Sequence, residues 1–287
     1  MVLAETSVTL HFLWKSLSMN QAWLIITHNE FDILKRLISL LDNEQSDFFV
    51  HIDKKVKELP ALSVKKGRLF ILKDRVDVRW GSVSQIETEL VLLEAALQNG
   101  PYSHYHILSG THLPLKPVNE LIEFYNNHAD EVVARCWPKD DGDADFKLRR
   151  YHFPLRHYKF GSAFQRRICQ LTWRCVIKVQ IIIGIRHLKK EAFIKTDNWL
   201  SLTENACKYL VSNKKQVLKK YRWSFCGDEY FVASELKEKG FRFFDCQNLL
   251  YVQFQYDTPS AIALDDYPRI QETGCLWARK FSSNHAH

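Results

Sequence analysis

Two adjacent carboxylates, Asp228 and Glu229, lie in the segment SFCGDEYFVASEL (residues 224–236), where many neighbours are aromatic or apolar. On a helix only residues three or four positions apart share a face, so the two carboxylates would point in different directions. Asp228 could cap a helix, with Glu229 in the first turn, where the helix dipole favours negative charge. Alternatively, a carboxylate held in a pocket could accept a proton as a general base. The segment by itself leaves both interpretations open.

A second group of carboxylates lies in PKDDGDADFK (residues 138–147). Asp141, Asp143 and Asp145 form two overlapping D-x-D strings, and carboxylate oxygens at such spacing are candidate ligands for a divalent cation. Because these residues do not follow a predicted strand, we interpret them as a solvated loop. The sequence therefore predicts neither a metal site nor another bound cofactor.

The elements that must position these residues are predicted by periodicity. Short apolar runs indicate buried strands, and apolar residues at helical spacing indicate helices. Ser82 or Ser84 is expected to cap the second helix and Gly100 to end it. The order of these elements is typical of an α/β domain with a mostly parallel central sheet flanked by helices. The strands are predicted at 22–28, 47–53, 68–74 and 104–110, and the helices at 29–43 and 82–100.

Open α/β sheets bind ligands at the carboxyl ends of their strands. Here those ends carry Thr27 and His28, then Asp53, then Ser109 and Gly110. Asp53 could accept hydrogen bonds from a nucleotide base or ribose, or could be a turn residue. The sequence has no G-x-G-x-x-G after the first strand, no G-x-x-x-x-G-K-[ST] and no G-x-S-x-G, which argues against dinucleotide enzymes, P-loop NTPases and α/β-hydrolases.

The composition, with 46% hydrophobic and 25% charged residues among 287, is that of a globular protein large enough for a substantial core. Seven cysteines without C-x-x-C spacing argue against zinc binding and favour a reducing compartment. No run reaches the roughly 18–20 apolar residues that cross a bilayer. Residues 1–18 do not resemble a signal peptide, and we expect a loose extension there, a single domain over residues 19–287 and a cytoplasmic location.

The net charge of +7 is concentrated in residues 147–195, which hold 13 Lys or Arg residues and one acidic residue, Glu191. Basic residues interrupt an apolar run, FQRRICQLTWRCVIKVQIIIGIRHLKK, in the second part of this segment. One interpretation is a core helix with a solvated basic face. The other is an arm that rests on an anionic membrane surface, on the inner face of the membrane, or binds an anionic lipid-linked ligand. Nucleic acid is not an expected partner, because aromatic residues are not interleaved as a stacking platform.

Six blocks occur in an order that is specific when they are taken together. They resemble the core-2/I-branching β-1,6-N-acetylglucosaminyltransferase family, glycosyltransferase family 14, which also includes peptide O-xylosyltransferases. The resemblance extends from about Met19 to about Phe281, and the length is similar to that of compact bacterial members. The blocks are HIDKK (51–55), VRWGSVSQIETELVLLEAAL (78–97), HILSGTHLPLKP (106–117), NWLSLTENACKYLV (198–211), FCGDEYFV (225–232) and LWARKF (276–281).

This resemblance implies a GT-A-type fold and inverting transfer of a sugar, N-acetylglucosamine or xylose, from a UDP-sugar to a glycan or lipid-linked glycan without a divalent metal. A role in surface polysaccharide synthesis follows as an expectation. The family's general base falls on Glu229, which favours the second interpretation of the carboxylate pair. The resemblance places donor binding on Thr27, His28, Asp53, Arg279 and Lys280. We assign acceptor binding to Asp228, Arg149 and Arg150, with a cap or an orienting partner as the other roles considered for Asp228.

The chain departs from the family pattern at several positions. His112 stands where Asp is common, Gly227 replaces the Pro before the acidic pair, and Phe254 stands where many members have Trp. Asp197 and Asn198 replace a Gly-Ser pair, and Ser260 lies where a second basic phosphate ligand is expected, for which Arg269 or Arg279 could substitute. A non-catalytic sugar- or nucleotide-binding protein on the same fold is therefore the alternative function.

Overall fold

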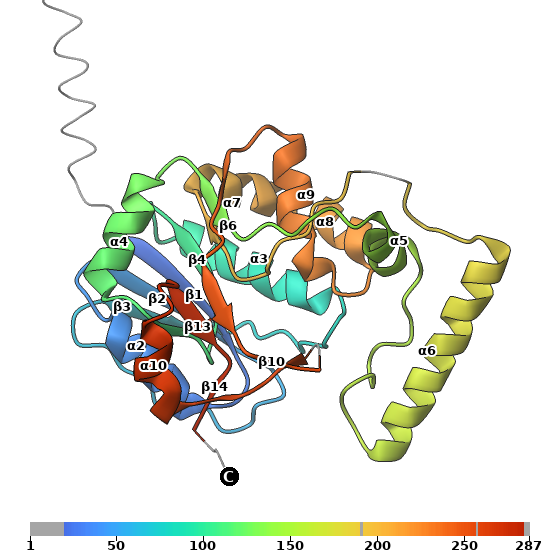
Figure 1. Cartoon of the computed structure of the whole chain (residues 1–287), viewed down its shortest axis with the longest axis horizontal. Coiled ribbons are helices and arrows are strands. Elements are labelled where there is room, and N and C mark those ends of the chain that lie inside the picture. The colour runs from blue at the N-terminus through green and yellow to red at the C-terminus, as the bar shows by residue number, and fades with distance from the viewer. Residues whose placement is uncertain (1–19, 190–191, 257, 284–287) are drawn as a thin grey trace, which may run out of the picture.

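The computed structural model describes residues 20–189, 192–256 and 258–283 (Figure 1). The predicted N-terminal extension, residues 1–18, lies outside the described residues. The described part is a mixed α/β domain with one large sheet and three small ones. Helices cover both faces of the large sheet, as predicted for a GT-A-type fold (Figure 1).

The large sheet has the strand order β3-β2-β1-β4-β7-β6-β8. Four neighbouring pairs are parallel, and only β7 runs against both of its neighbours. The prediction of a mostly parallel sheet is thus confirmed. The strands are β1 (Gln21–Thr27), β2 (Ser46–Ile52), β3 (Arg68–Ile71), β4 (Tyr105–Ser109), β6 (Val132–Ala134), β7 (Ser201–Leu202) and β8 (Phe243–Asp245).

The two helices predicted in the first hundred residues are present as α2 (Phe31–Leu41) and α3 (Ser84–Leu97). The prediction for the ends of α3 was wrong. Val83, whose side chain makes no capping hydrogen bond, is the N-cap residue. The Ser84 hydroxyl accepts a hydrogen bond from the Arg79 backbone N–H (2.7 Å), and the Ser84 N–H donates to the hydroxyl of Ser82, one position before the cap (3.3 Å). The helix also ends at Leu97, before Gly100.

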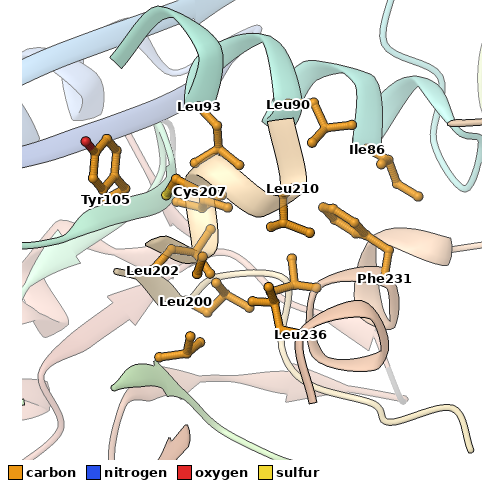
Figure 2. Packing of buried hydrophobic residues seen from close by; sticks show 14 of the residues in the cluster. Ile86, Leu90, Leu93, Tyr105, Leu200, Leu202, Cys207, Leu210, Phe231 and Leu236 are labelled. Atoms are coloured by element: carbon orange, nitrogen blue, oxygen red, sulfur yellow. The ribbon is translucent and has the colours of Figure 1, made fainter. Parts of the chain in front are cut away.

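Two hydrophobic clusters lie on opposite faces of the large sheet. One packs α3 against α7 (Glu204–Ser212), α8 (Lys214–Tyr221) and α9 (Phe231–Glu238). Figure 2 shows Leu90 and Leu93 of α3 pointing toward the region of Leu210 in α7. Burial of such aliphatic side chains is the main force that holds these helices on the sheet.

The second cluster joins α2, α4 (Val118–Asn127) and α10 (Tyr267–Gln271) to a three-stranded sheet. In that sheet β13 (Trp277–Arg279) lies between β5 (Leu113–Pro114) and β9 (Leu250–Val252). The C-terminal end of the chain thereby returns to the β1–β2 region (Figure 1). The remaining short strands are β10 (Phe254–Gln255), β11 (Thr258–Pro259), β12 (Ile262–Ala263) and β14 (Phe281–Ser282).

The acidic segment and the basic segment are both helical. The prediction of a loop for residues 138–147 was wrong from Asp141 onward, because α5 (Asp141–Arg149) begins there, capped by the side chain of Asp140. The basic segment contains α6 (Ala163–Ile183), which stands at the periphery, beside the loop over residues 150–160 rather than on the sheet (Figure 1). Within the described ranges, no helix is long and apolar enough to pass through a membrane.

Candidate active site

The carboxylate pair lies in a tight 3-10 turn, η1 (Gly227–Glu229). The helix that follows, α9, has Tyr230 at its N-cap position, so Asp228 is not its cap. Cys226 precedes the turn in a left-handed conformation (φ 50°), and its N–H donates to the Gly81 carbonyl (2.9 Å). The turn is therefore fixed against the segment that leads into α3.

Asp228 points into the protein and is only 4% exposed. Its Oδ2 accepts hydrogen bonds from Gln85 Nε2 (2.7 Å) and Asn198 Nδ2 (3.1 Å). Burial, together with the charge of Glu229, raises the pKa of Asp228 to about 7. Glu89 lies nearby in α3, fully buried, and burial followed by the charge of Asp228 raises its pKa well above the ordinary value. On the buried side of the turn, Asp228 therefore keeps its proton more readily than an ordinary aspartate does.

Glu229 faces the other way, and 30% of its side chain is exposed. Its Oε2 lies 2.8 Å from Lys147 Nζ and 3.6 Å from Lys195 Nζ. Both lysines also reach Asp143, at 3.3 Å and 3.0 Å, and Asp143 accepts a hydrogen bond from the Tyr230 hydroxyl (2.5 Å). Burial alone would lower the pKa of Lys147, but the charges of Glu229 and Asp143 raise it above its ordinary value. Glu229 is thus an oriented carboxylate that solvent and a ligand can reach.

The predicted donor residues of the first two strands are adjacent. Asp53 follows β2, and its N–H donates to the carbonyl of Thr27 at the end of β1 (2.9 Å). The carboxylate of Asp53 accepts from the backbone N–H of Lys55 (2.8 Å) and from its Nζ (2.6 Å). His28 has an exposed side chain, but the loss of water around part of its ring lowers its pKa. The charge of Asp53 raises this pKa, and the charges of Lys280 and Lys55 lower it further. The structure therefore brings Thr27, His28, Asp53 and Lys280 to one edge of the sheet.

Arg279 and Lys280, although adjacent, occupy different environments. The Arg279 guanidinium lies 4.7 Å over the Trp199 ring, and burial lowers its pKa to about 10, an effect that Asp197 partly offsets. Its Nε has no hydrogen-bond partner among the described residues. Lys280 is exposed, and its carbonyl accepts a hydrogen bond from Ile262 N–H (2.9 Å). Of these two residues, Lys280 is the one that presents an exposed cation at the edge that holds His28.

Sequence reasoning did not single out Lys159. Its Nζ lies 3.4 Å from the centre of the Trp80 ring. Burial lowers its pKa, the charge of Lys280 lowers it further, and Cys226 acts in the opposite direction. Lys159 is therefore near enough to feel the charge of Lys280 and to be affected by Cys226, which precedes the carboxylate turn. The signal that the sequence offered was Trp80 in the block over residues 78–97, because a tryptophan ring can bind a cation such as a lysine ammonium group.

The two arginines assigned to the acceptor do not converge on Glu229. Arg149 Nη1 and Arg150 Nη2 both pair with Asp145, at 2.5 Å and 3.2 Å, and Arg186 joins the same carboxylate (2.7 Å). The cation of α5 that reaches Glu229 is Lys147, which sequence reasoning did not single out. An acceptor role for Arg149, Arg150 and Asp228 stays a prediction.

The D-x-D aspartates are distributed over three different sets of contacts. Asp141 pairs with Lys139, Asp143 with the lysines near Glu229, and Asp145 with arginines. In the part of the chain that the structure describes, no cluster of three or more His, Cys, Asp or Glu side chains could hold a metal ion. All seven cysteines are free thiols.

Comparison with known proteins gives one family match. No curated protein matches the chain. The model of the family described as "Branch: Core-2/I-Branching enzyme" matches residues 21–242, which span β1 to α9 and include Thr27, Asp53 and Glu229. With the α/β fold and the carboxylate turn described above, this match shows that the chain belongs to the Core-2/I-branching enzyme family, glycosyltransferases that act on glycans.

Proposed function

We propose that the protein is an inverting glycosyltransferase that moves N-acetylglucosamine, or alternatively xylose, from a UDP-sugar to a glycan without a divalent metal. Glu229 is the general base in this proposal. The observation that carries it is the arrangement of the carboxylate turn, where Glu229 is oriented by Lys147 and remains reachable from solvent.

In the reaction, Glu229 accepts the proton of the acceptor hydroxyl while that oxygen attacks the anomeric carbon of the donor. The new carbon–oxygen bond forms as the bond to the phosphate oxygen of UDP breaks, which inverts the anomeric configuration. The proton neutralises Glu229. Lys147 and Lys195 can accommodate this change, because both also pair with Asp143, which keeps its negative charge.

The leaving UDP gains negative charge on a phosphate oxygen. Lys280 is suited to stabilise it, since it is exposed at the same edge as Asp53 and has no carboxylate within ion-pair distance among the described residues. Lys159 supplies a second cation nearby and could take the place of the missing basic residue at Ser260. Two such cations support metal-independent departure of UDP.

We further propose a lipid-linked glycan of a surface polysaccharide as the acceptor, used at the cytoplasmic face of a membrane. The basic helix α6 and the seven free thiols support this location. A UDP-release assay with UDP-N-acetylglucosamine, UDP-xylose, UDP-glucose and UDP-galactose, each with and without EDTA, tests the donor and the metal independence together. Binding of UDP without release from any donor would favour the non-catalytic alternative.

The decisive variant is Glu229→Gln, which keeps the size and hydrogen bonding of the side chain but cannot accept the proton. We expect turnover to fall by about 10²–10⁴-fold, the usual contribution of a positioned base. UDP affinity, measured by calorimetry, and the melting temperature should change little.

The matched control is Glu94→Gln, which removes the carboxylate of another lysine ion pair (Lys214, 2.6 Å) far from the turn. It should retain full turnover. If Glu229→Gln also retains near-normal turnover, Glu229 is not the base.

A further inference from the structure

Helix α6 (Ala163–Ile183) is attached to the rest of the protein by one narrow face. Trp173 Nε1 donates to His152 Nδ1 (3.1 Å), and the Gln180 side chain bonds the backbone N–H and carbonyl of Tyr151 (2.8 Å each). Cys169 and Ile177 complete this inner face and are buried. The inner face is thus already partnered by the loop over residues 150–160.

The opposite face of α6 carries large apolar side chains that nothing in the described chain covers. They recur three, four or eight residues apart, which places them on one side of a helix. Phe164 at one end is 73% exposed and Ile182 at the other is 81% exposed. We call this set the outer stripe: Phe164, Ile168, Leu171, Val179 and Ile182. At about 1.5 Å of rise per residue, it is roughly 27 Å long.

The charges beside the outer stripe have one sign. Helix α6 contains Arg166, Arg167, Arg174 and Lys178 and no acidic residue. All four are exposed, and within the described ranges none has a carboxylate in ion-pair distance. At 100° per residue, Arg167, Arg174 and Lys178 lie along one side of the stripe. The face therefore combines apolar area with uncompensated positive charge.

We infer that α6 docks the protein on an anionic lipid bilayer, lying in the plane of the headgroups with the outer stripe at the acyl boundary. An exposed apolar face bordered by lysine and arginine is the pattern of such interfacial helices. A second copy of the chain is a poorer occupant of this face, because two such helices would bring eight cations and no carboxylate together. Phospholipid headgroups supply the missing negative charge.

The position of α6 gives this docking a consequence for the site, which rests on the proposed function. Trp173 of the inner face lies 5.6 Å from Phe225, the residue that immediately precedes Cys226 and the carboxylate turn. Phe225 in turn contacts Trp80, the ring on which Lys159 lies (5.2 Å). A bilayer in contact with the outer stripe would hold a membrane-bound acceptor on the far side of α6, so that only this helix separates the bilayer from the carboxylate turn. Docking itself requires no activity and can be measured without a sugar donor.

Flotation of the full chain with vesicles tests the inference. Vesicles of phosphatidylcholine that contain phosphatidylserine should carry the protein, pure phosphatidylcholine vesicles should carry far less, and added salt should reduce binding. The variant Arg167→Gln/Arg174→Gln/Lys178→Gln should lower partitioning onto the anionic vesicles by roughly 100-fold. The matched control is Lys215→Gln/Lys219→Gln/Lys239→Gln, which removes three exposed cations from elsewhere on the surface and should bind like the wild type.

The apolar part is tested by Phe164→Ser/Ile182→Ser, which changes only exposed side chains. Partitioning should fall by roughly 100-fold, whereas Leu40→Ser/Leu59→Ser, at exposed sites elsewhere, should have no effect. An environment-sensitive fluorophore on Cys175, the one exposed cysteine among the seven, should report an apolar surrounding on anionic vesicles only.

Equal binding to neutral and anionic vesicles, or no binding to either, would overturn the inference. Sedimentation without lipid would overturn it as well, if it shows a dimer that Phe164→Ser/Ile182→Ser dissociates, since the stripe would then be an interface between copies of the chain.

Discussion

At the residue scale, the two adjacent carboxylates of the turn have opposite environments. Asp228 accepts two amide hydrogen bonds inside the protein, while Glu229 meets two lysines at the surface. Two carboxyl groups whose surroundings separate their protonation behaviour can serve different roles in one site. In the mechanism proposed above, Glu229 moves the proton, and we propose that Asp228 orients the turn through Gln85 and Asn198.

Asp228 should make stability depend on pH. Its pKa is raised to about 7 in the folded protein, so the folded state binds a proton that the unfolded chain releases near pH 4. Stability should therefore fall as pH rises from about 4 to about 7, by about 1.4 kcal/mol per pH unit at most. Asp228→Asn removes this loss and should raise the unfolding midpoint at pH 8 but not at pH 4.

The control for that experiment is Asp74→Asn at an exposed position, which should leave the pH profile unchanged. A profile of Asp228→Asn that parallels the wild type would mean that Asp228 is ionised in the folded protein throughout this range.

Lys280 should carry most of the stabilisation of the leaving phosphate. Lys280→Ala should reduce turnover by about 10²–10³-fold, the typical effect of removing one preorganised transition-state donor. Exposed Lys54, beside Asp53, provides the control, and Lys54→Ala should be nearly silent in the same UDP-release assay. If EDTA abolishes wild-type activity and manganese restores it, Asp141, Asp143 and Asp145 must be tested as metal ligands.

At the element scale, α6 depends on its inner face alone for attachment. The ring of Trp173 contacts Tyr158 (5.3 Å) and Phe225 (5.6 Å) and donates its N–H to His152. Because the helix packs on a loop rather than on the sheet, its local stability should be separable from that of the core.

Trp173→Ala should therefore loosen α6 without unfolding the protein. The lost packing is worth about 3 kcal/mol, near the lower limit for an aromatic residue replaced by Ala. Hydrogen–deuterium exchange of α6 amides should become roughly 100-fold faster, while exchange in β1 and β2 stays slow. Leu171→Ala on the outer stripe is the control, and it should change neither the exchange of the α6 amides nor the exchange in β1 and β2. Equal acceleration by both variants would show that the two faces of α6 do not differ.

At the scale of the whole molecule, the C-terminal segment lies outside the matched family region yet carries Lys280, which we propose as a donor ligand. The match ends at residue 242, and β13 and Lys280 follow it. Trp277 fixes β13 in place: its Nε1 donates to the Tyr125 hydroxyl (2.9 Å), and its ring meets the edge of Trp23 in β1 (5.7 Å). The edge that we predict to bind the donor and the hydrophobic core therefore depend on the same strand, β13.

Trp277→Ala should destabilise the entire domain by about 3–5 kcal/mol, because it leaves a large cavity and removes the hydrogen bond to the Tyr125 hydroxyl. Denaturant unfolding monitored by circular dichroism gives this difference directly. Exposed Trp223 offers the comparison, since Trp223→Ala should cost far less. If Trp277→Ala unfolds in two separate transitions, β13 is not part of a single cooperative core.

The amino-acid sequence by itself determined the strands β1, β2 and β4, the helices α2 and α3, the place of Thr27 at a strand end, and the membership of Asp53 and Glu229 in recognisable blocks. These features are local: a continuous apolar run or a helical spacing of apolar residues reports which side of one element is buried, whatever the rest of the chain does. Capping was less predictable, because the Ser84 hydroxyl had a competing partner in the Arg79 backbone.

Only the tertiary structure decided which cations meet which carboxylates. Lys147 reaches Glu229 across 82 residues of sequence, whereas Arg149, two residues later, turns to Asp145. Such pairings depend on how α5 packs against the carboxylate turn, and no spacing along the chain encodes that packing. The exposure of the outer stripe was likewise decided by the tertiary structure. An apolar helix face predicted from sequence is buried only if another element packs against it, and the sequence pattern does not show whether one does.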